Sequence, residues 1–400
     1  MSKSSIIFIN HYASIPKFPG PTRNFDFAAT LVVLDWQVTL FSCRFNHYLR
    51  SYLPNPPARE SGVRLNWVWS TAYRGNSIQR ELNIVVFSFF SFWKGLFTGG
   101  DVIVAVTPPL ESAWSAWLLS RIKRVPFVLD VEDLWPDSLI SMGFRNKVVI
   151  GLLRLLERFL YQHADHILTV AQEMKEYLLR QGVPEAKVTL IPLGANIPPD
   201  RQNRTAIRGR YGWQDDQVIA VYVGAHGPAN ALETLLKAAE DLTGFEQVKI
   251  VLFGDGSAKP GLKEKLAALN LTNISLEDPV TPEMVPDILR AAEIGIASLK
   301  DNDTFKTVRP NKLYEYMAVG LPIVCCIDGE AKRFVEEVGA GVAVTPEDHQ
   351  GLAIALKKLT QNVELRHEMG ENGRRFVALE GDRVKLAKVM GQTLKKVITG

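Results

Sequence analysis

The chain has 400 residues, of which 46 are Lys or Arg and 43 are Asp or Glu, so its formal net charge is +3 at pH 7. This length exceeds what one hydrophobic core usually serves, and it favours two domains. The charges are too evenly balanced for the continuous positive field that a nucleic-acid backbone demands, so no polynucleotide partner is expected.

The cysteines and the apolar runs indicate the compartment. Cys43, Cys325 and Cys326 are too few and too hydrophobically embedded for a disulfide framework or a zinc site, which favours a reducing environment. The amino terminus enters the short apolar run Ile6–Ile9 without the pattern of a signal peptide. The longest uncharged stretch, 82–93, is shorter than the roughly 20 apolar residues that span a bilayer. We therefore expect a cytoplasmic protein that is not inserted in a membrane.

Short β-branched runs alternate with helical patterns through the first half of the chain, and this alternation is typical of a parallel sheet. The expected strands are Ile6–Asn10, Gln37–Cys43, Val63–Trp69, Asp101–Val106, Pro126–Asp130, His166–Val170 and Val188–Pro192. A polar segment marked by prolines then begins at Ile197 and predicts a connection between domains.

The same alternation restarts in the second half and ends in a helical segment, 365–398. The expected strands are Val218–Val223, Val248–Phe253, Asn273–Leu276, Ile294–Leu299, Pro322–Ile327 and Gly341–Val344. The pattern predicts two doubly wound α/β domains, 1–197 and 198–375, with 376–400 as a helix that crosses back to the first. Ligands of open α/β sheets bind beyond the carboxyl ends of the strands, so we expect the two domains to face each other across a cleft.

The segment 309–322 carries the clearest chemical signal. Pro310 favours the start of a helix and Gly320 its end, which leaves room for about two turns. A helix amino terminus with a lysine beside it, here Lys312, is a natural cradle for a diphosphate. Glu315 lies one turn deeper, where its carboxylate can accept hydrogen bonds from ribose hydroxyls. An ordinary amphipathic helix with a solvated Glu315 is the alternative.

The run 310–324, Pro-Asn-Lys-Leu-Tyr-Glu-Tyr-Met-Ala-Val-Gly-Leu-Pro-Ile-Val, resembles the donor-site helix of family 4 retaining glycosyltransferases, which have the two-domain GT-B fold. The resemblance implies that Glu315 binds the ribose of a nucleotide sugar, in a site shared with Arg309 and Asn311. A second glutamate of the family, which touches the donor sugar, would stand at Thr307. This departure is similar to the form found in bacterial N-acetylfucosamine transferases of O-antigen and capsule synthesis.

Further passages extend the resemblance over nearly the whole chain. In 221–230, at the first strand-to-helix turn of the second domain, Gly224 and Gly227 permit close approach of the backbone to a phosphate. The resemblance implies that this turn faces the donor, and His226 within it is a candidate catalytic residue.

A second glycine-marked strand end includes Gly254 and is followed by Lys259. Lys259 resembles the family's basic residue that neutralises the donor diphosphate, a charge that it would share with Lys312. A plain strand-to-helix turn is the alternative explanation for Gly254.

Two segments of the first domain are candidates as well. The run Asn10–Tyr12 and the segment 18–23 precede an apolar helix and resemble the family's amino-terminal glycine loop, which closes on the diphosphate. This resemblance makes Gly20 and Arg23 candidate binding residues. The segment 129–137 concentrates carboxylates after a buried-looking strand. Glu132 and Asp133 are catalytic or acceptor-side candidates there, with a capped helix start as the alternative.

The resemblance implies a transfer in which the leaving phosphate helps to take the acceptor proton while the protein supplies positioning and charge neutralisation. No metal or other cofactor is then expected. Asp301 and Asp303 form an Asp-x-Asp sequence, but no third ligand accompanies them, and we expect a solvated loop. Asp301, Asp303 and Thr307 are the candidates to replace the family's missing glutamate.

An aromatic stretch, 85–97, is richer in Phe and Trp than a buried helix requires. With Arg121, Lys123, Arg124 and the amphipathic segment 148–162, it predicts a face of the first domain that rests on an anionic membrane. A buried helix is the alternative.

Taken together, the resemblance and this face predict transfer from a UDP-sugar to a polyprenyl-diphosphate-linked saccharide. The donor would carry an N-acetylated hexose or deoxyhexose. A UDP-sugar 2-epimerase of similar fold and a non-catalytic nucleotide-sugar-binding subunit remain as alternatives.

Overall fold

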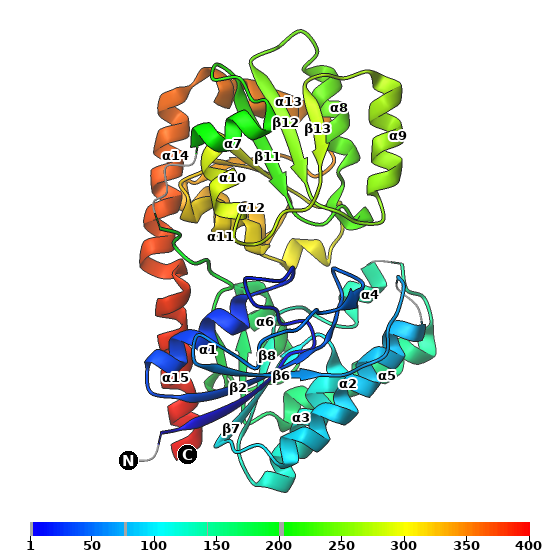
Figure 1. Cartoon of the computed structure of the whole chain (residues 1–400), viewed down its shortest axis with the longest axis vertical. Coiled ribbons are helices and arrows are strands. Elements are labelled where there is room, and N and C mark those ends of the chain that lie inside the picture. Colours follow the sequence, from blue (N-terminus) through cyan, green and yellow to red (C-terminus); the bar gives the residue numbers. More distant parts are fainter. Residues whose placement is uncertain (1–2, 76–77, 142, 200–203) are drawn as a thin grey trace. The chain divides into compact units, whose positions relative to one another are not determined.

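The computed structural model describes residues 3–75, 78–141, 143–199 and 204–400, so residues 200–203 of the expected connection lie outside the described residues. The chain divides into two compact units (Figure 1). The first comprises Met1–Pro192 and Arg383–Gly400, and the second comprises Leu193–Asp382. The boundaries expected from the sequence stand after residues 197 and 375.

The first unit is built on an eight-stranded sheet with the order β10-β9-β8-β7-β1-β2-β6-β5, in which only β5 is antiparallel to its neighbour. Its strands are β1 (Ser5–Ile9), β2 (Gln37–Cys43), β5 (Arg59–Glu60), β6 (Val63–Val68), β7 (Val102–Thr107), β8 (Phe127–Val131), β9 (His166–Thr169) and β10 (Val188–Leu190). A separate antiparallel pair joins β3 (Phe45–Asn46) and β4 (Ser51–Tyr52).

Helices cover both faces of this sheet. They are α1 (Arg23–Val33), α2 (Ile78–Leu96), α3 (Leu110–Lys123), α4 (Asp137–Ser141), α5 (Lys147–His163), α6 (Gln172–Arg180) and α15 (Arg383–Thr399). In Figure 1, α1 and α15 lie together on one side of the sheet, and α2, α3 and α5 lie on the other. The guanidinium of Arg383 donates to Asp26 at 2.7 Å, so the end of the chain is tied to α1.

The second unit has a six-stranded parallel sheet with the order β13-β12-β11-β14-β15-β16. Its strands are β11 (Val218–Val223), β12 (Val248–Phe253), β13 (Ile274–Glu277), β14 (Ile294–Ser298), β15 (Ile323–Cys326) and β16 (Gly341–Ala343). Its helices are α7 (Arg204–Tyr211), α8 (Glu233–Asp241), α9 (Lys259–Leu269), α10 (Val285–Ala291), α11 (Asn311–Ala318), α12 (Glu330–Val338), α13 (His349–Gln361) and α14 (Val363–Phe376). The strand order reverses between β11 and β14, which makes this the topological switch point of the sheet.

Both faces of the second sheet are buried, as the near-continuous apolar strands require. Ile219 and Val221 of β11 pack with α11 and α12 in one core, while Ala220 and Tyr222 pack with α8 and α13 in another. Every strand expected from the sequence is present, with its ends shifted by no more than two residues. The short strands β3, β4 and β5 were not expected. Among the described residues, no helix has the length and apolarity to cross a bilayer.

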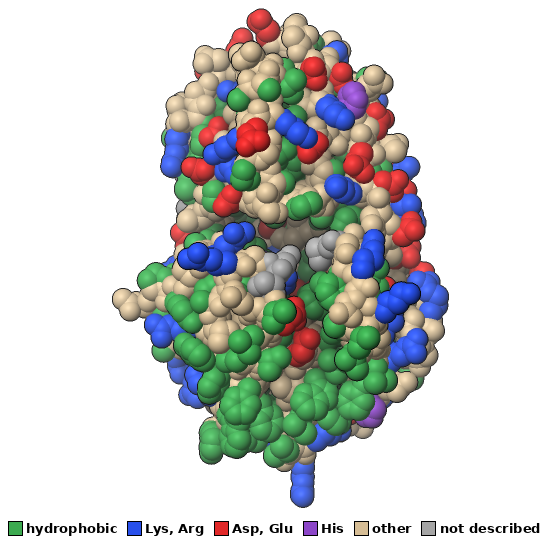
Figure 2. Space-filling view, turned by 90° about the vertical axis from the view of Figure 1, so that its right-hand side faces the viewer, with side chains coloured by type: hydrophobic (Ala, Val, Ile, Leu, Met, Phe, Trp, Pro, Cys, Tyr) green, Lys and Arg blue, Asp and Glu red, His purple; other side chains and the backbone are tan. Residues whose placement is uncertain are grey.

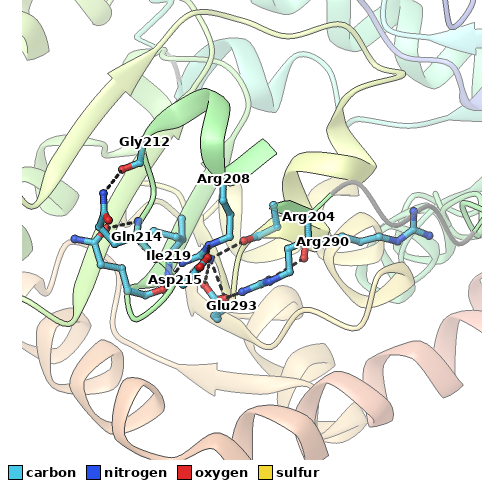
Figure 3. Close-up of polar contacts among 10 residues, drawn as sticks. Arg204, Arg208, Gly212, Gln214, Asp215, Ile219, Arg290 and Glu293 are labelled. Atoms are coloured by element: carbon cyan, nitrogen blue, oxygen red, sulfur yellow. Dashed lines mark hydrogen bonds and ion pairs between the residues drawn. The ribbon is translucent and has the colours of Figure 1, made fainter. Parts of the chain in front are cut away.

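A polar network ties α7 to the amino ends of the strands in the second unit (Figure 3). Arg208 is 2% exposed, and its guanidinium pairs with Glu293 at 3.1 Å. The other carboxylate oxygen of Glu293 accepts the backbone N–H of Ile219 at 2.7 Å. Arg290 donates to the carbonyl oxygen of Pro198 at 2.7 Å, so the chain before residue 200 is held to this unit. The network lies at the end of the sheet opposite the switch-point loops. Its charged groups pair with each other and with backbone groups, so they hold the fold together.

Candidate functional site

At the switch point of the second unit, one tyrosine side chain lies between two neighbouring strands. Strands β11 and β14 pair over only two positions before they diverge. The hydroxyl of Tyr316, from α11, fills the gap, because it accepts the N–H of Val223 at 3.3 Å and donates to the carbonyl of Ile296 at 3.1 Å. A Cβ at Gly295 would lie 2.5 Å from the Tyr316 ring, so only glycine leaves room for it. Tyr316 thus holds α11 against the diverging ends of β11 and β14.

Two glycine-containing loops meet beside this helix. A Cβ at Gly254 would lie 1.8 Å from the carbonyl oxygen of Gly224, and the φ angles of these glycines are +150° and +154°. A Cβ at Gly256 would lie 2.4 Å from the carbonyl oxygen of His226. The N–H of His226 donates to the carbonyl of Asp255 at 2.8 Å. Side chains at these glycines would push the loops apart, so the close backbone approach requires glycine.

Lys312 stands at the first turn of α11. Its Nζ lies 3.6 Å from the centre of the Tyr222 ring, and a Cβ at Gly224 would lie 3.1 Å from it. Within the described parts of the chain, this ammonium makes no hydrogen bond. Burial lowers the pKa of Lys312 to about 7, against the opposing effect of Glu315. A lysine held over a ring at a helix amino terminus is therefore placed to meet an anion.

His226 is fully buried between the same loops. Neither of its ring nitrogens has a hydrogen-bond partner among the described residues. Burial, and then the charges of Lys259 and Lys312, lower the pKa of His226 to about 4. The imidazole is therefore neutral at pH 7 and offers one N–H donor and one acceptor nitrogen.

Glu315 and Asn311 are linked along α11. The amide of Asn311 donates to a carboxylate oxygen of Glu315 at 2.5 Å, which fixes the direction of that carboxylate. Gly227 has an extended backbone and precedes a short 3₁₀ turn, Pro228–Asn230, in the loop after β11. The hydroxyl of Thr307 donates to the carbonyl of Thr304 at 2.8 Å, so that it closes its own turn.

Two basic residues expected at this site have partners within the unit. Lys259 is 5% exposed, and its Nζ donates to the carbonyls of Gly254 at 2.8 Å and Glu277 at 2.7 Å. This ammonium joins the carboxyl ends of β12 and β13. The guanidinium of Arg309 pairs with Glu330, and its Cζ lies 4.0 Å from the centre of the Phe334 ring. Of these three cations, Lys312 is the one that makes no hydrogen bond or ion pair with a carboxylate or carbonyl of the described residues.

The first unit contains a separate charged cluster. Arg23 is 3% exposed and pairs with Asp130 at 2.7 Å and Glu132 at 2.9 Å. Its other nitrogen donates to the carbonyl of Ile191 at 3.1 Å, and Asn24 donates to Glu132 at 2.8 Å. Burial raises the pKa of Glu132, although Arg23 opposes the shift. The charge of Arg23 is thus compensated inside the unit, by an aspartate that the sequence analysis did not single out.

Asp133 and Gly20 lie near this cluster in the chain. A carboxylate oxygen of Asp133 accepts the N–H of Leu134 at 2.9 Å and the hydroxyl of Ser138 at 2.5 Å. Burial raises the pKa of Asp133 to about 6. These two hydrogen bonds cap the turn that follows Asp133. A carboxyl with a pKa of about 6 can also exchange a proton near neutrality. Gly20 has φ +132°, and a Cβ there would lie 3.0 Å from Cβ of Ser14.

A third group of polar side chains lies in the first unit, and Tyr12 is its member from a segment that the sequence had singled out. Tyr12 accepts hydrogen bonds from Nε and Nη2 of Arg80 at 3.2 and 2.8 Å. The Nδ1 atom of His47 lies 2.6 Å from the hydroxyl of Tyr73. Burial lowers the pKa of His47 to about 4. These residues come from four separate segments, and no local pattern in the sequence connects them.

Comparisons with known proteins agree with this architecture. Residues 22–194 match the model of the glycosyl transferase 4-like domain, and residues 203–376 match that of glycosyl transferases group 1. The chain is 24% identical to the putative colanic acid biosynthesis glycosyl transferase WcaI of Escherichia coli, over 71% of this chain and 72% of that protein.

The chain is a GT-B glycosyltransferase.

Solved structures show the same fold. The sucrose-phosphate synthase of Thermosynechococcus elongatus is 18% identical, with a TM-score of 0.80 over 99% of each chain. HepE of Anabaena, solved in complex with UDP, is 14% identical, with a TM-score of 0.74 over 98% of this chain and 100% of HepE. The sequence-based expectation of two doubly wound domains with transferase activity is confirmed.

The Asp-x-Asp pair of this glycosyltransferase lies beside a lysine. Nζ of Lys306 lies 3.1 Å from Asp303 and 3.6 Å from Asp301. Within the part of the chain that the structure describes, no group of three or more His, Cys, Asp or Glu side chains is arranged to hold a metal ion. The Nε2 atom of His11 lies 2.7 Å from Oδ1 of Asn83, within the first unit.

Proposed function

We propose that this glycosyltransferase moves a sugar, with retention of configuration, from a UDP-sugar to a polyprenyl-diphosphate-linked saccharide during the assembly of a bacterial surface polysaccharide. The sugar in this proposal is an N-acetylated hexose or deoxyhexose such as N-acetylfucosamine. The observation that carries the donor half is the Lys312 ammonium, which stands at the amino end of α11 without a hydrogen-bond acceptor among the described residues.

The donor site is the region around α11 and the two glycine loops. The diphosphate lies against the α11 amino terminus and Lys312, where the helix dipole and the ammonium both favour negative charge. The close approach of Gly224 and Gly254 leaves backbone, without side chains, on the adjoining surface. Glu315, oriented by Asn311, accepts the ribose hydroxyls. The complex of the similarly folded HepE with UDP supports this choice of nucleotide.

In this reaction the main task of the protein is to stabilise the negative charge that develops on the leaving group. When the bond between the sugar and the diphosphate breaks, negative charge grows on the leaving phosphate oxygen. Protonated Lys312 and the aligned N–H groups of α11 meet that charge in fixed positions, so little reorganisation is needed. The leaving phosphate takes the acceptor proton. Buried His226 adds no positive charge to this stabilisation at pH 7, because its pKa is about 4.

The acceptor half rests on other support. WcaI is named for colanic acid biosynthesis, and WaaG, solved at a TM-score of 0.69 to this chain, is named for lipopolysaccharide biosynthesis. With the lipid-linked acceptor proposed here, the proposal includes peripheral contact of this chain with the inner face of the cytoplasmic membrane. Asp133 is the acceptor-side candidate of the first unit in this proposal, and burial raises its pKa to about 6.

Replacement of Glu315 tests the donor half. Two hydrogen bonds donated by ribose hydroxyls to a carboxylate contribute about 1.5–3 kcal/mol each, so Glu315→Ala should weaken UDP binding about a hundredfold or more. Glu337→Ala, an exposed change on α12, is the matched control and should leave affinity unchanged. Affinity is measured by calorimetry and folding by thermal unfolding.

Unchanged UDP affinity in a folded Glu315→Ala variant would remove Glu315 from the site. Conversion of a free UDP-sugar without any acceptor would favour the epimerase instead. UDP binding without turnover of any sugar or acceptor would favour the binding subunit.

A further inference from the structure

Helix α2 (Ile78–Leu96) exposes large apolar side chains and buries several small or polar ones. Its buried residues are Asn83, Ile84, Phe87, Ser88, Ser91 and Gly95, and four of these six are small or polar. Its exposed apolar residues, with Phe97 just beyond its end, are large: they are Ile78, Leu82, Val85, Phe89, Phe90, Trp93 and Phe97. Trp93 is 48% exposed and Phe97 is 88% exposed. Folding alone does not explain this distribution, because burial of the larger side chains would be more favourable.

Packing explains why α2 is turned this way. The helix lies against α3, and a Cβ at Gly95 would lie 2.3 Å from Cδ2 of Leu119. On the same inner side, the amide of Asn83 contacts His11 and donates to the carbonyl of Thr71. The close helix contact and the buried amide therefore fix the small and polar residues inward, and the aromatic residues are left on the surface.

The two neighbouring helices have the same character. Helix α3 lies between α2 and α5, and it exposes Trp114 and Ile122. Helix α5 buries Glu157, whose carboxylate accepts the hydroxyl of Tyr161 at 3.0 Å. Its exposed apolar residues are Val148, Val149, Leu152 and Leu155. Figure 2 shows hydrophobic side chains gathered over a broad area of the first unit. We call the exposed apolar residues of these three helices, with Phe97, the α2–α3–α5 face.

The charged residues of these helices indicate which kind of partner binds the α2–α3–α5 face. The segments 78–97, 110–124 and 144–163 contain nine Lys or Arg residues and three Glu residues, one of which, Glu157, is buried. Arg121 and Arg154 are paired with Asp165 and Asp137, which lie just outside these segments, and the other seven cations still outnumber the glutamates. The whole chain is nearly balanced, so positive charge is concentrated here. A second copy seated on this face would bring like charges together, whereas an anionic lipid surface would be attracted to it. Phe and Trp side chains are also those that enter the interface of a bilayer.

We propose that the α2–α3–α5 face docks on an anionic lipid bilayer, with α2 and α5 lying in the plane of the membrane and their aromatic and aliphatic side chains entering the headgroup region. This inference deepens the proposed function, on which its choice of partner rests, because it names the surface that brings the enzyme to a lipid-linked acceptor. Docking itself needs neither donor nor acceptor. Its test is therefore independent of turnover.

Vesicle flotation with the full chain tests the proposal. Vesicles of phosphatidylcholine with one third phosphatidylglycerol should bind the protein, and pure phosphatidylcholine vesicles should bind it at least tenfold less. The double variant Phe89→Ser with Trp93→Ser should lose at least tenfold in binding. Ile354→Ser, which changes a residue that is 67% exposed on α13 of the second unit, is the matched control and should bind as the original chain does.

Two further measurements keep the outcomes separate. Arg145→Glu with Lys147→Glu removes cations at the start of α5 and should lower binding to the anionic vesicles, even if the aromatic variant folds poorly. The UDP-induced thermal shift should be unchanged in both double variants. Equal vesicle binding by the original chain and both variants would overturn the proposal. So would a dimer in solution that Phe89→Ser with Trp93→Ser dissociates, because the face would then join two copies.

Discussion

Binding of UDP should draw a proton onto Lys312. Burial lowers the pKa of this lysine to about 7. At pH 8, therefore, only about one tenth of the free enzyme carries the charge. A diphosphate beside Nζ favours the ammonium form and raises its pKa. Each UDP bound at pH 8 should then take up about 0.9 proton, and affinity should fall as pH rises above about 7, because the lysine must be protonated first.

The pH dependence of folding follows from the same group. The pKa of Lys312 in the folded, unliganded chain is below the value of 10.5 for a free lysine. The unfolded chain therefore binds more protons between pH 7 and 10.5. The penalty of the buried ammonium is present in full below pH 7, and it is relieved as pH rises through that window. UDP should weaken this trend, because a diphosphate beside Nζ raises the pKa of Lys312 towards that of a free lysine.

Calorimetry in two buffers of different ionisation enthalpy measures the proton uptake directly. Lys312→Met should abolish the uptake at pH 8 and weaken UDP binding. His226→Asn is the control, because a group with a pKa of about 4 contributes no proton at this pH unless UDP raises its pKa by several units. An uptake of less than about 0.3 proton in the original chain would refute the assignment of Lys312 to the diphosphate. So would an uptake that persists in Lys312→Met.

Two other substitutions test the geometry of each unit by urea unfolding. Gly254→Ala places a Cβ against the carbonyl of Gly224 at a positive φ and should cost at least about 2 kcal/mol of stability along with UDP affinity. Gly261→Ala, with nothing within 4 Å, should cost nothing, and equal losses would contradict the argument. Arg23→Met leaves the carboxylates of Asp130 and Glu132 without their cation and should cost about 3–5 kcal/mol. Added Asp130→Asn should restore part of that loss, and no restoration would show that the pair does not account for it.

The strands and the limits of α11 could be predicted because they depend on local patterns. Apolar β-branched runs in regular alternation with helical segments are sufficient to place a parallel sheet. Pro310 and Gly320 delimit α11 through their own backbone preferences, and Gly320 has the positive φ expected at a helix end. Lys312 and Glu315 are placed along one short helix by its periodicity alone. These features need no information from distant parts of the chain.

The partners of the charged groups were decided only by the tertiary structure. The sequence predicts the same role for Lys259 and Lys312, which is to neutralise a diphosphate. In the structure, Lys259 joins the ends of β12 and β13, whereas Lys312 lies over the ring of Tyr222. Arg23 meets Asp130 across 107 positions of the chain. A charge is satisfied by whichever groups the sheet brings within about 4 Å, and no local rule specifies those groups.

The same reasoning applies to the surface of the first unit. The aromatic richness of 85–97 is visible in the sequence, and it is compatible with a buried helix or an exposed one. Which side of α2 faces inward depends on the contact of Gly95 with Leu119 and on the buried amide of Asn83. Composition therefore determined that this helix is apolar. Only long-range packing, in which small residues permit two helices to approach closely, decided that its aromatic side would remain exposed.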